Sequence, residues 1–225
     1  MKNNGELQKD VQDAIKWEPF LNDAEIGVSV KDGIVTLSGL VDSYIKKSEA
    51  ETAAQNVAGV KAVVEKIEVR FGSSSDKKED NEIAAEILDA FKWRQEVPDN
   101  MVKIKVEDGW VTLQGELPWH FQKDAAGNAV KYLMGVKGIS NNIKVKSDTE
   151  DVIEKADVEK ALRRNWAIAQ SEINVEVLAH TATLTGTVDS TYQKSEAGRI
   201  AGNAAGIWTV VNEIRIDYQY ALMDE

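Results

Sequence analysis

The sequence predicts an α+β fold built from three tandem units, each in the order helix, strand, strand, helix, strand. Two observations support this prediction. A pattern of alternating apolar residues that ends in glycine occurs three times in the 225 residues, and the same helical and strand periodicities surround each copy. We expect the units at residues 3–71, 79–147 and 154–218, each a small three-stranded mixed sheet with two helices on one face.

The repeat is defined by the segment Gly-Ile-Val-Thr-Leu-Ser-Gly at residues 33–39. It returns at residues 109–115, and again at residues 180–186 with His180 in place of the first glycine. The register then holds without a gap to the end of each unit. Equivalent positions carry Lys47, Lys123 and Lys194, then Gly59, Gly135 and Gly206, then Ile67, Ile143 and Ile214. A match of this length indicates three copies of one structural unit.

Each unit begins with a predicted amphipathic helix. Leu7, Val11 and Ile15 recur at four-residue intervals, which places them in one apolar stripe of a helix. The copies of this stripe are Ile83, Ile87 and Phe91 in the second unit, and Val158, Leu162 and Trp166 in the third. The first helix ends with Trp17 in the first unit and Trp93 in the second, and Ile168 is the match in the third. A position that is apolar in every copy is most often in the core, so we expect these three side chains to be buried.

A β-hairpin follows the first helix. Residues 26–30 alternate apolar and polar side chains as in a half-buried strand, and an Asp-Gly pair at residues 32–33 supplies the positive φ angles of a tight turn. The second unit repeats this pair at residues 108–109. The third has Ala179 and His180 there, which adopt positive φ less readily, so we expect a different turn or backbone strain.

The second helix carries small residues on its inner stripe, including three alanines within residues 50–54, so it can lie close to the sheet. Asp42 or Ser43 is suited to cap this helix, and Asp189 is expected to do so in the third unit. The repeated glycines fit tight turns and helix ends, so we assign them structural rather than phosphate-binding roles. They are Gly33, Gly39, Gly59, Gly109, Gly115, Gly135, Gly186 and Gly206.

The composition is that of a globular protein, with 43% hydrophobic and 29% charged residues. No apolar run reaches the roughly 18 residues that a membrane-spanning helix needs, and the first residues lack the apolar centre of a secretory signal. We therefore expect a cytoplasmic location for the chain as written, or a periplasmic one if a leader has been removed. The absence of cysteine excludes disulfides, thiolate nucleophiles and cysteine-rich metal sites.

The chemistry-bearing residues favour a binding protein over an enzyme. The net charge of −11 makes nucleic acid an unfavourable partner. His120 and His180 are the two histidines, and they occupy non-equivalent positions without a nucleophile or ligand at a recognisable spacing. We expect no catalytic residue, no metal and no cofactor.

The pattern G-x-V-T-L-x-G, the alanine-rich helix after it and the later A-G-V-x-x-V-x-x-x-I resemble the BON family, named for bacterial osmotically inducible and nodulation proteins. The resemblance covers nearly the whole chain as three tandem domains. The third copy departs from it at His180 and in a shorter connection between first helix and first strand. The resemblance implies a non-enzymatic module that binds phospholipid surfaces or other envelope components under osmotic or envelope stress.

The second unit holds the residues that we interpret as contact candidates. Residues 118–121 (Pro-Trp-His-Phe) replace residues 42–45 (Asp-Ser-Tyr-Ile) of the first unit, and an indole at a turn suits a membrane–water interface. Trp119, with Phe121, Trp110 and Lys123 as weaker candidates, is predicted to contact lipid or a partner. Packing of Trp119 against a neighbouring unit is an equal alternative.

Two functions follow from these observations. The first is non-enzymatic binding of a phospholipid or cell-envelope surface in a bacterial stress response, where the repeated lysines meet headgroups at about 1 kcal/mol each. The alternative is a soluble cytoplasmic protein that senses an ion, since a BON relative senses potassium, or that acts as a protein–protein scaffold with possible self-association.

Overall fold

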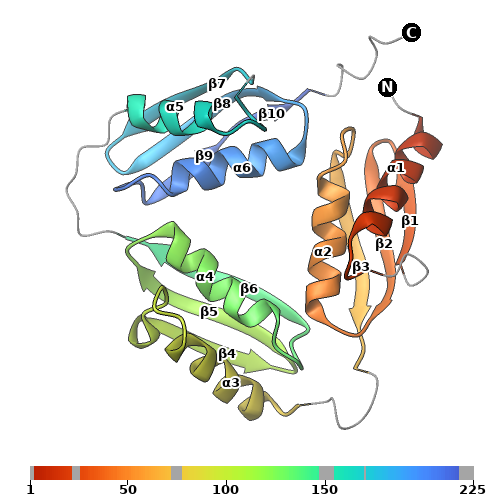
Figure 1. Ribbon diagram of the computed structural model, residues 1–225, viewed down its shortest axis with the longest axis vertical. Helices are drawn as coiled ribbons and strands as arrows, with labels where there is room; N and C mark the ends of the chain where they lie inside the picture. Colours follow the sequence, from red (N-terminus) through yellow and green to blue (C-terminus); the bar gives the residue numbers. More distant parts are fainter. Residues whose placement is uncertain (1–2, 22–25, 72–77, 147–154, 170, 218–225) are drawn as a thin grey trace. The chain divides into compact units, whose positions relative to one another are not determined.

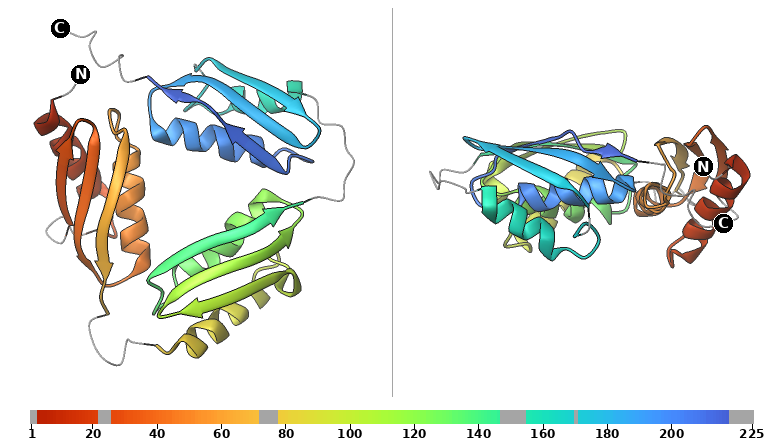
Figure 2. Two further views of the ribbon diagram at one scale, coloured as in Figure 1. Left: turned by 180° about the vertical axis from the view of Figure 1, so that it is seen from behind. Right: turned by 90° about the horizontal axis from the view of Figure 1, so that it is seen from above.

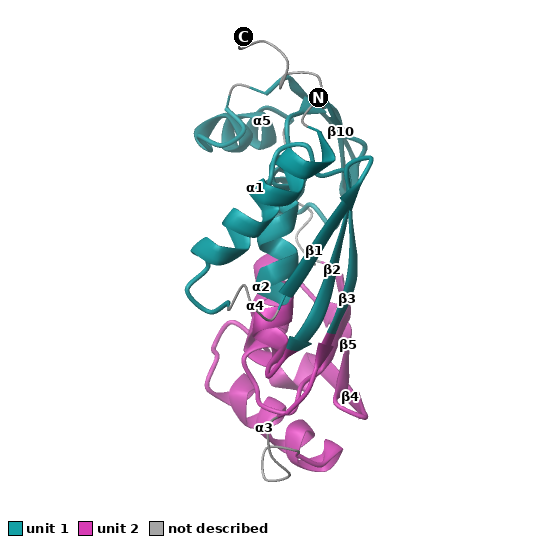
Figure 3. Cartoon of the chain, turned by 90° about the vertical axis from the view of Figure 1, so that its right-hand side faces the viewer, with its two compact units in different colours: residues 1–40, 48–67, 152–225 teal, residues 41–47, 68–151 magenta. Residues whose placement is uncertain are grey.

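The structure, a computed structural model, describes residues 3–21, 26–71, 78–146, 155–169 and 171–217 (Figure 1). Its backbone divides into two compact units (Figure 3). One comprises residues 1–40, 48–67 and 152–225, and the other comprises residues 41–47 and 68–151. The first therefore holds most of the first repeat and all of the third, and the second holds the middle repeat.

The element order confirms the predicted α+β fold of three repeated units. The first repeat contains α1 (Asn4–Trp17), β1 (Ile26–Lys31), β2 (Ile34–Val41), α2 (Tyr44–Gln55) and β3 (Ala62–Val69). The second contains α3 (Asp80–Lys92), the 3-10 helix η2 (Asp99–Met101), β4 (Val102–Glu107), β5 (Trp110–Leu117), α4 (His120–Lys131) and β6 (Gly138–Val145). The third contains α5 (Lys155–Arg164), β7 (Ile173–Leu178), β8 (Thr181–Val188), α6 (Thr191–Gly202), β9 (Thr209–Asn212) and β10 (Arg215–Ile216).

Each repeat forms a mixed sheet with the hairpin's return strand in the middle. In the second repeat β4 pairs antiparallel with β5, and β6 pairs parallel with β5 over its full length. In the third repeat the last strand is divided into β9 and β10, which both pair with β8. Thr181 pairs with Thr209 and Thr187 with Arg215, so the interruption leaves the register unchanged.

The core lies between each sheet and its two helices. In the second repeat α3 and α4 cover one face of the sheet. The left view of Figure 2 shows the opposite face, which no helix of this repeat covers and which we call the bare face. Val111 and Leu113 on β5 are buried on the helix side, whereas Trp110 and Gln114 point to the bare side. The helix α4 contributes the buried Ala126 and Ala129, whose small side chains allow close approach to the strands.

The turn of the third hairpin carries the backbone strain that the sequence predicts. Asp32 and Asp108 have φ angles of 54° and 49°, each followed by a glycine with positive φ. In the third repeat Ala179 has a φ of 53°, while His180 leaves the left-handed region. The His180 ring instead stacks on Trp208, with centroids 3.6 Å apart and planes at 2°, and its Nδ1 lies 2.8 Å from the Gly206 carbonyl oxygen. This stack holds the hairpin where the other repeats use glycine.

The second glycine of the repeated motif lies inside a strand rather than at a turn or helix end. Gly39, Gly115 and Gly186 have φ angles of 146°, 147° and 127° within β2, β5 and β8. A Cβ on Gly115 would lie 2.1 Å from the Met101 carbonyl oxygen. The same atom on Gly186 would lie 2.0 Å from the carbonyl oxygen of Glu172. The glycine is required because the chain entering the first strand crosses directly over it.

We expect Gly115→Ala to lower the free energy of unfolding by about 2 kcal/mol or more, since it adds backbone strain and a steric overlap. Urea unfolding followed by circular dichroism measures this change. Gly127→Ala is the matched control, because Gly127 lies within α4 and its Cβ would contact a side-chain atom at 3.2 Å. The control should change stability by less than about 1 kcal/mol. Equal effects of the two substitutions would contradict this account of the motif.

Candidate functional site

Each repeat exposes one tryptophan at the carboxyl end of its first helix. The side chains of Trp17, Trp93 and Trp166 are 85%, 89% and 88% exposed. The prediction that Trp17 and Trp93 belong to the core is therefore wrong, as is the placement of Trp166 on the inner stripe of its helix. We define these three positions, with the cationic residues in the last turn of each helix, as the tryptophan tips.

The geometry of the helix explains why Trp17 and Trp93 point to solvent. Ile15 and Phe91 are the last buried residues of α1 and α3. Each tryptophan comes two residues later, which rotates it about 200° around the helix axis, away from the core. In these two repeats the tryptophan therefore occupies an outer position.

The third repeat exposes its tryptophan through a different local structure. The helix α5 ends at Arg164, after the buried Leu162, and the following turn directs Trp166 outward. Ile168 is 2% exposed and completes the core, which confirms the prediction of its burial. Relative to the first two repeats, the helix end and the tryptophan are thus both shifted along the sequence, yet an exposed indole is kept.

A hydrogen-bonded network fixes this turn. Asn165 Nδ2 donates to Glu196 Oε1 at 2.8 Å, and Asn165 Oδ1 accepts from the Ala167 backbone N–H at 2.9 Å. Gln193 Nε2 donates to the Ala167 carbonyl oxygen at 2.8 Å. The Arg199 guanidinium holds both oxygens of Glu196 at 2.8 and 2.7 Å. These Arg199 contacts, with a smaller contribution from Asn165, lower the pKa of Glu196 below its ordinary value against the opposing effect of burial.

Cationic residues accompany each exposed indole. Lys16 and Lys92 lie in the last turns of α1 and α3, and Arg163 and Arg164 in the last turn of α5. Cations are favoured there because the helix dipole leaves partial negative charge at the carboxyl end. Lys92 also pairs with Asp89 at 2.9 Å, and this hydrogen bond raises the pKa of Lys92.

An indole beside a cation matches the chemistry of a membrane–water interface. The ring body is apolar, its N–H donates a hydrogen bond, and an ammonium or guanidinium group attracts phosphate. Within the described ranges, no helix is both long and apolar enough to cross a bilayer.

The residues that the sequence selected do not gather in one place. Trp119 is half-buried at the amino end of α4, with its ring stacked on Phe121 at a centroid distance of 6.4 Å. Trp110 lies on the bare side of the sheet and is 52% exposed. Lys123 is partly buried, and its carbonyl oxygen accepts a hydrogen bond from Asn141 Nδ2 at 2.8 Å. Lys194 and Asn212 repeat that bond in the third repeat at 2.7 Å, so it links the second helix to the last strand.

The predicted caps of the second helix are only partly as expected. In the third repeat Ser190, and not Asp189, is the N-cap, and its side chain accepts from the Gln193 N–H at 3.2 Å. In the first repeat the carboxylate of Asp42 pairs with Lys46 at 2.9 Å and accepts from Ser43. The bond from Lys46, aided by the Ser43 hydroxyl, lowers the pKa of Asp42. Asp42 therefore acts as an ion-pair partner.

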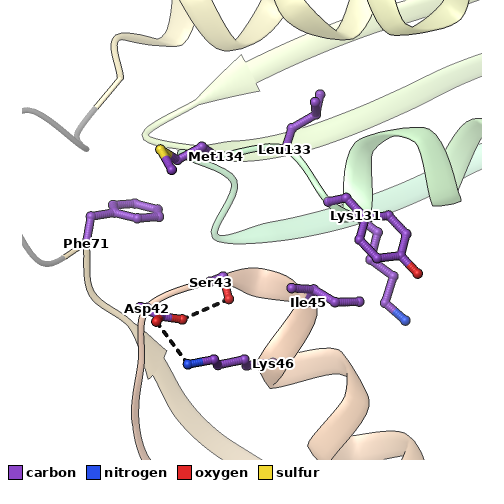
Figure 4. A pocket seen from close by; sticks show the side chains of 9 residues that line it. Asp42, Ser43, Ile45, Lys46, Phe71, Lys131, Leu133 and Met134 are labelled. Atoms are coloured by element: carbon purple, nitrogen blue, oxygen red, sulfur yellow. Dashed lines mark hydrogen bonds and ion pairs between the residues drawn. The ribbon is translucent and has the colours of Figure 1, made fainter. Parts of the chain in front are cut away.

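Other potential sites carry less chemistry. No group of three His, Cys, Asp or Glu side chains suited to a metal occurs among the described residues. A cavity of about 410 Å³ in the compact unit of residues 41–47 and 68–151 is shown in Figure 4. Its acidic group, Asp42, is already paired with Lys46 and Ser43. Lys131 and Tyr132 also line it, and Ile45, Phe71, Leu133 and Met134 form its apolar part.

Comparison with known proteins identifies the repeat. Residues 3–70, 79–147 and 150–218 each match the BON domain. Over 133 residues the chain is 33% identical to the osmotically-inducible protein Y of Escherichia coli (strain K12). That match covers 56% of this chain and 64% of the relative.

Two solved structures also align with most of the chain. Both are of CdsD, a structural protein of the type III secretion system of Chlamydia trachomatis. The first is 19% identical and covers 93% of this chain and 91% of the solved chain. The second, a C-terminal domain, is 18% identical and covers 94% and 97%. The TM-score is 0.24 in both cases, and we infer nothing from this likeness.

We expect Glu196→Gln to destabilise the third repeat by about 1 kcal/mol at pH 7, because it removes the charged partner of Arg199. The folded-state pKa of Glu196 is lowered, so its contribution is fully present above the unfolded value of about 4.5 and disappears as pH falls through the folded pKa. Thermal unfolding should therefore separate the variant from the unchanged chain at pH 7 and bring them together near pH 3. A difference that grows on acidification would contradict the assignment.

Proposed function

Because the chain belongs to the BON domain family, with three BON domains along its length, we propose that it is a non-enzymatic bacterial stress protein that binds phospholipid surfaces through its tryptophan tips. The observation that carries the proposal is the exposure of Trp17, Trp93 and Trp166. A large apolar side chain left in water at the equivalent end of every repeat marks a contact surface more strongly than a single exposed residue does.

The charges of the tips support an anionic lipid surface. The chain as a whole has a net charge of −11, which repels such a surface. Lys16, Lys92 and Arg163 place positive charge beside the indoles, and each cation near an anionic surface contributes about 1 kcal/mol. These cations supply local attraction at the tips despite the net charge of the chain.

Three weak contacts on one chain can bind a surface usefully. Joining them raises their effective concentration, and avidity gains of about 10²–10⁴ follow where the geometry permits simultaneous binding. Repetition of a modest site fits adhesion to an extended surface. We assign Trp119 and Phe121 a supporting role, since they are less exposed than the tips.

The relative in Escherichia coli connects this binding to a physiological condition. Its name states that it is osmotically inducible, and the match covers 64% of its length. We infer a role in osmotic or envelope stress, when lipid surfaces are perturbed.

Replacing Trp17, Trp93 and Trp166 together by serine should weaken binding to vesicles of phosphatidylcholine and phosphatidylglycerol by at least about 100-fold, and each single replacement by up to about tenfold. Vesicle co-sedimentation measures both effects. The thermal stability of the triple variant should be unchanged, because these side chains make little contact with the core. Leu178→Ser is the control, because Leu178 is an exposed apolar residue that lies at the end of β7 and outside the tips. This variant should bind normally. Normal binding by the triple variant would contradict the proposal.

Replacing Lys16, Lys92, Arg163 and Arg164 by glutamine should reduce binding to the anionic vesicles at low ionic strength and have little effect at 1 M salt, where the Debye length is about 3 Å. Binding to pure phosphatidylcholine should change little, since it depends on the indoles. An equal loss of binding to neutral vesicles would contradict this role, because it would show that the substitutions act by disturbing the fold.

A further inference from the structure

The bare face of the second sheet carries an aromatic side chain that the other two sheets lack. Trp110 begins β5 and is paired across the sheet with Glu107 and Gly138. Its equivalents by register are Ile34 in the first repeat and Thr181 in the third. Among the described residues on the bare faces of the three sheets, Trp110 is the one aromatic side chain.

The ring of Trp110 is held against the backbone of its neighbour. A Cβ built on Gly138 would lie 2.2 Å from Trp110 Cζ3 and 2.4 Å from Cε3, so the ring occupies the space that a side chain would fill. Ala62 and Thr209 stand at this position in the other repeats. Gly138 therefore leaves room for the indole to lie against the sheet, where the Trp110 side chain remains 52% exposed.

Rows of polar side chains continue from the indole along the same face. Thr112 pairs with Lys105 and Ser140, and the next outward row joins Gln114 to Lys103 and Asn142. Alternate residues of a strand point to one face, and neighbouring strands lie about 4.8 Å apart. Hydroxyl, amide and ammonium groups thus surround one side of an apolar ring at the spacing of a sheet.

The charge of this face differs from that of the whole chain. Lys103, Lys105 and Lys144 outnumber Glu107 and Glu116, and Glu107 is paired with Lys105 at 2.8 Å. The Lys47 ammonium also lies 6.0 Å from the centre of the Trp110 ring. The lysines of this face exceed its carboxylates by one, and Lys47 adds a further cation beside the ring, so on a chain of −11 this face favours a ligand that carries negative charge.

We propose that the bare face of the second sheet binds an acidic polysaccharide. Trp110 packs on the C–H face of a sugar ring, Thr112, Gln114 and Asn142 exchange hydrogen bonds with sugar hydroxyls, and the lysines meet the carboxylates. A single-stranded nucleic acid fits less well, because that class of ligand is bound by a basic groove with successive aromatic side chains. Here one indole is surrounded mainly by neutral polar groups.

The other two sheets provide an internal comparison. The bare face of the first repeat carries the exposed Ile34, Leu40 and Val64. In the third repeat threonines recur along β8 on this face, at residues 181, 183, 185 and 187. The combination of a seated indole, amides and lysines is specific to the second repeat, so one site per chain is expected.

Isothermal titration calorimetry of the full chain tests the proposal, with hexamannuronate as the acidic glycan, maltohexaose as the neutral glycan and a hexathymidylate as single-stranded DNA. Hexamannuronate should bind with one site per chain at about 150 mM salt, and the other two should bind at least about tenfold more weakly. Trp110→Thr, which introduces the residue of the third repeat, should weaken hexamannuronate binding by about tenfold or more. Gln114→Ala, an exposed position outside the core, should weaken it without altering folding.

Trp93→Ser is the matched control, since it removes an exposed indole from the tip of the same repeat. It should bind hexamannuronate normally and bind vesicles up to about tenfold more weakly, whereas Trp110→Thr should bind vesicles normally and hexamannuronate more weakly. Equal binding of maltohexaose, tighter binding of hexathymidylate, no binding of hexamannuronate, or normal binding by folded Trp110→Thr and Gln114→Ala would each overturn the proposal. These outcomes are separate from the vesicle assay, so either activity can fail alone.

Discussion

A small three-stranded sheet with two helices can bury only one of its faces, and this constraint determines where every exposed feature of the BON domains lies. A unit of about 65 residues buries only about 60% of the surface of its unfolded chain. In the second repeat the core side of β5 is filled by Val111, Leu113 and Leu117. The helix ends and the bare face of the sheet are left to solvent, and the candidate binding features occupy those two places.

The three domains keep one inner framework and differ outside it. The glycine inside the second strand and the alanines of the second helix serve close packing, and in the second and third domains the amide of Asn141 or Asn212 also donates to a helix carbonyl. Where the framework changes, a neighbouring change accompanies it. His180 replaces the turn glycine in the third domain, and Trp208 stands where the other domains have lysine, so that the two rings stack. The outer positions have no such requirement, which allows an indole on one sheet and threonines on another.

Much of the fold could be predicted from residue patterns, because period and turn chemistry are local. The alternation in residues 26–30, the Asp-Gly turns and the strain at Ala179 follow from such rules. The tryptophan tips could not be predicted in this way. In the first two repeats the tryptophan lies two residues after the last buried position of its helix, and its apolar character alone did not distinguish this outer position from the core. The available signal was the angle of Trp17 and Trp93 relative to the stripe of α1 and α3.

The sequence by itself determined the family, the repeat and its register, because glycines, turn pairs and apolar periodicities act within a few residues of each other. The tertiary structure decided which indoles face water. Trp166 is exposed because α5 ends at Arg164 and because Glu196, on a different helix, fixes the turn through Asn165. Trp110 lies flat because Gly138 of the adjacent strand leaves room for its ring. Both outcomes depend on residues about 30 positions away that only folding brings together.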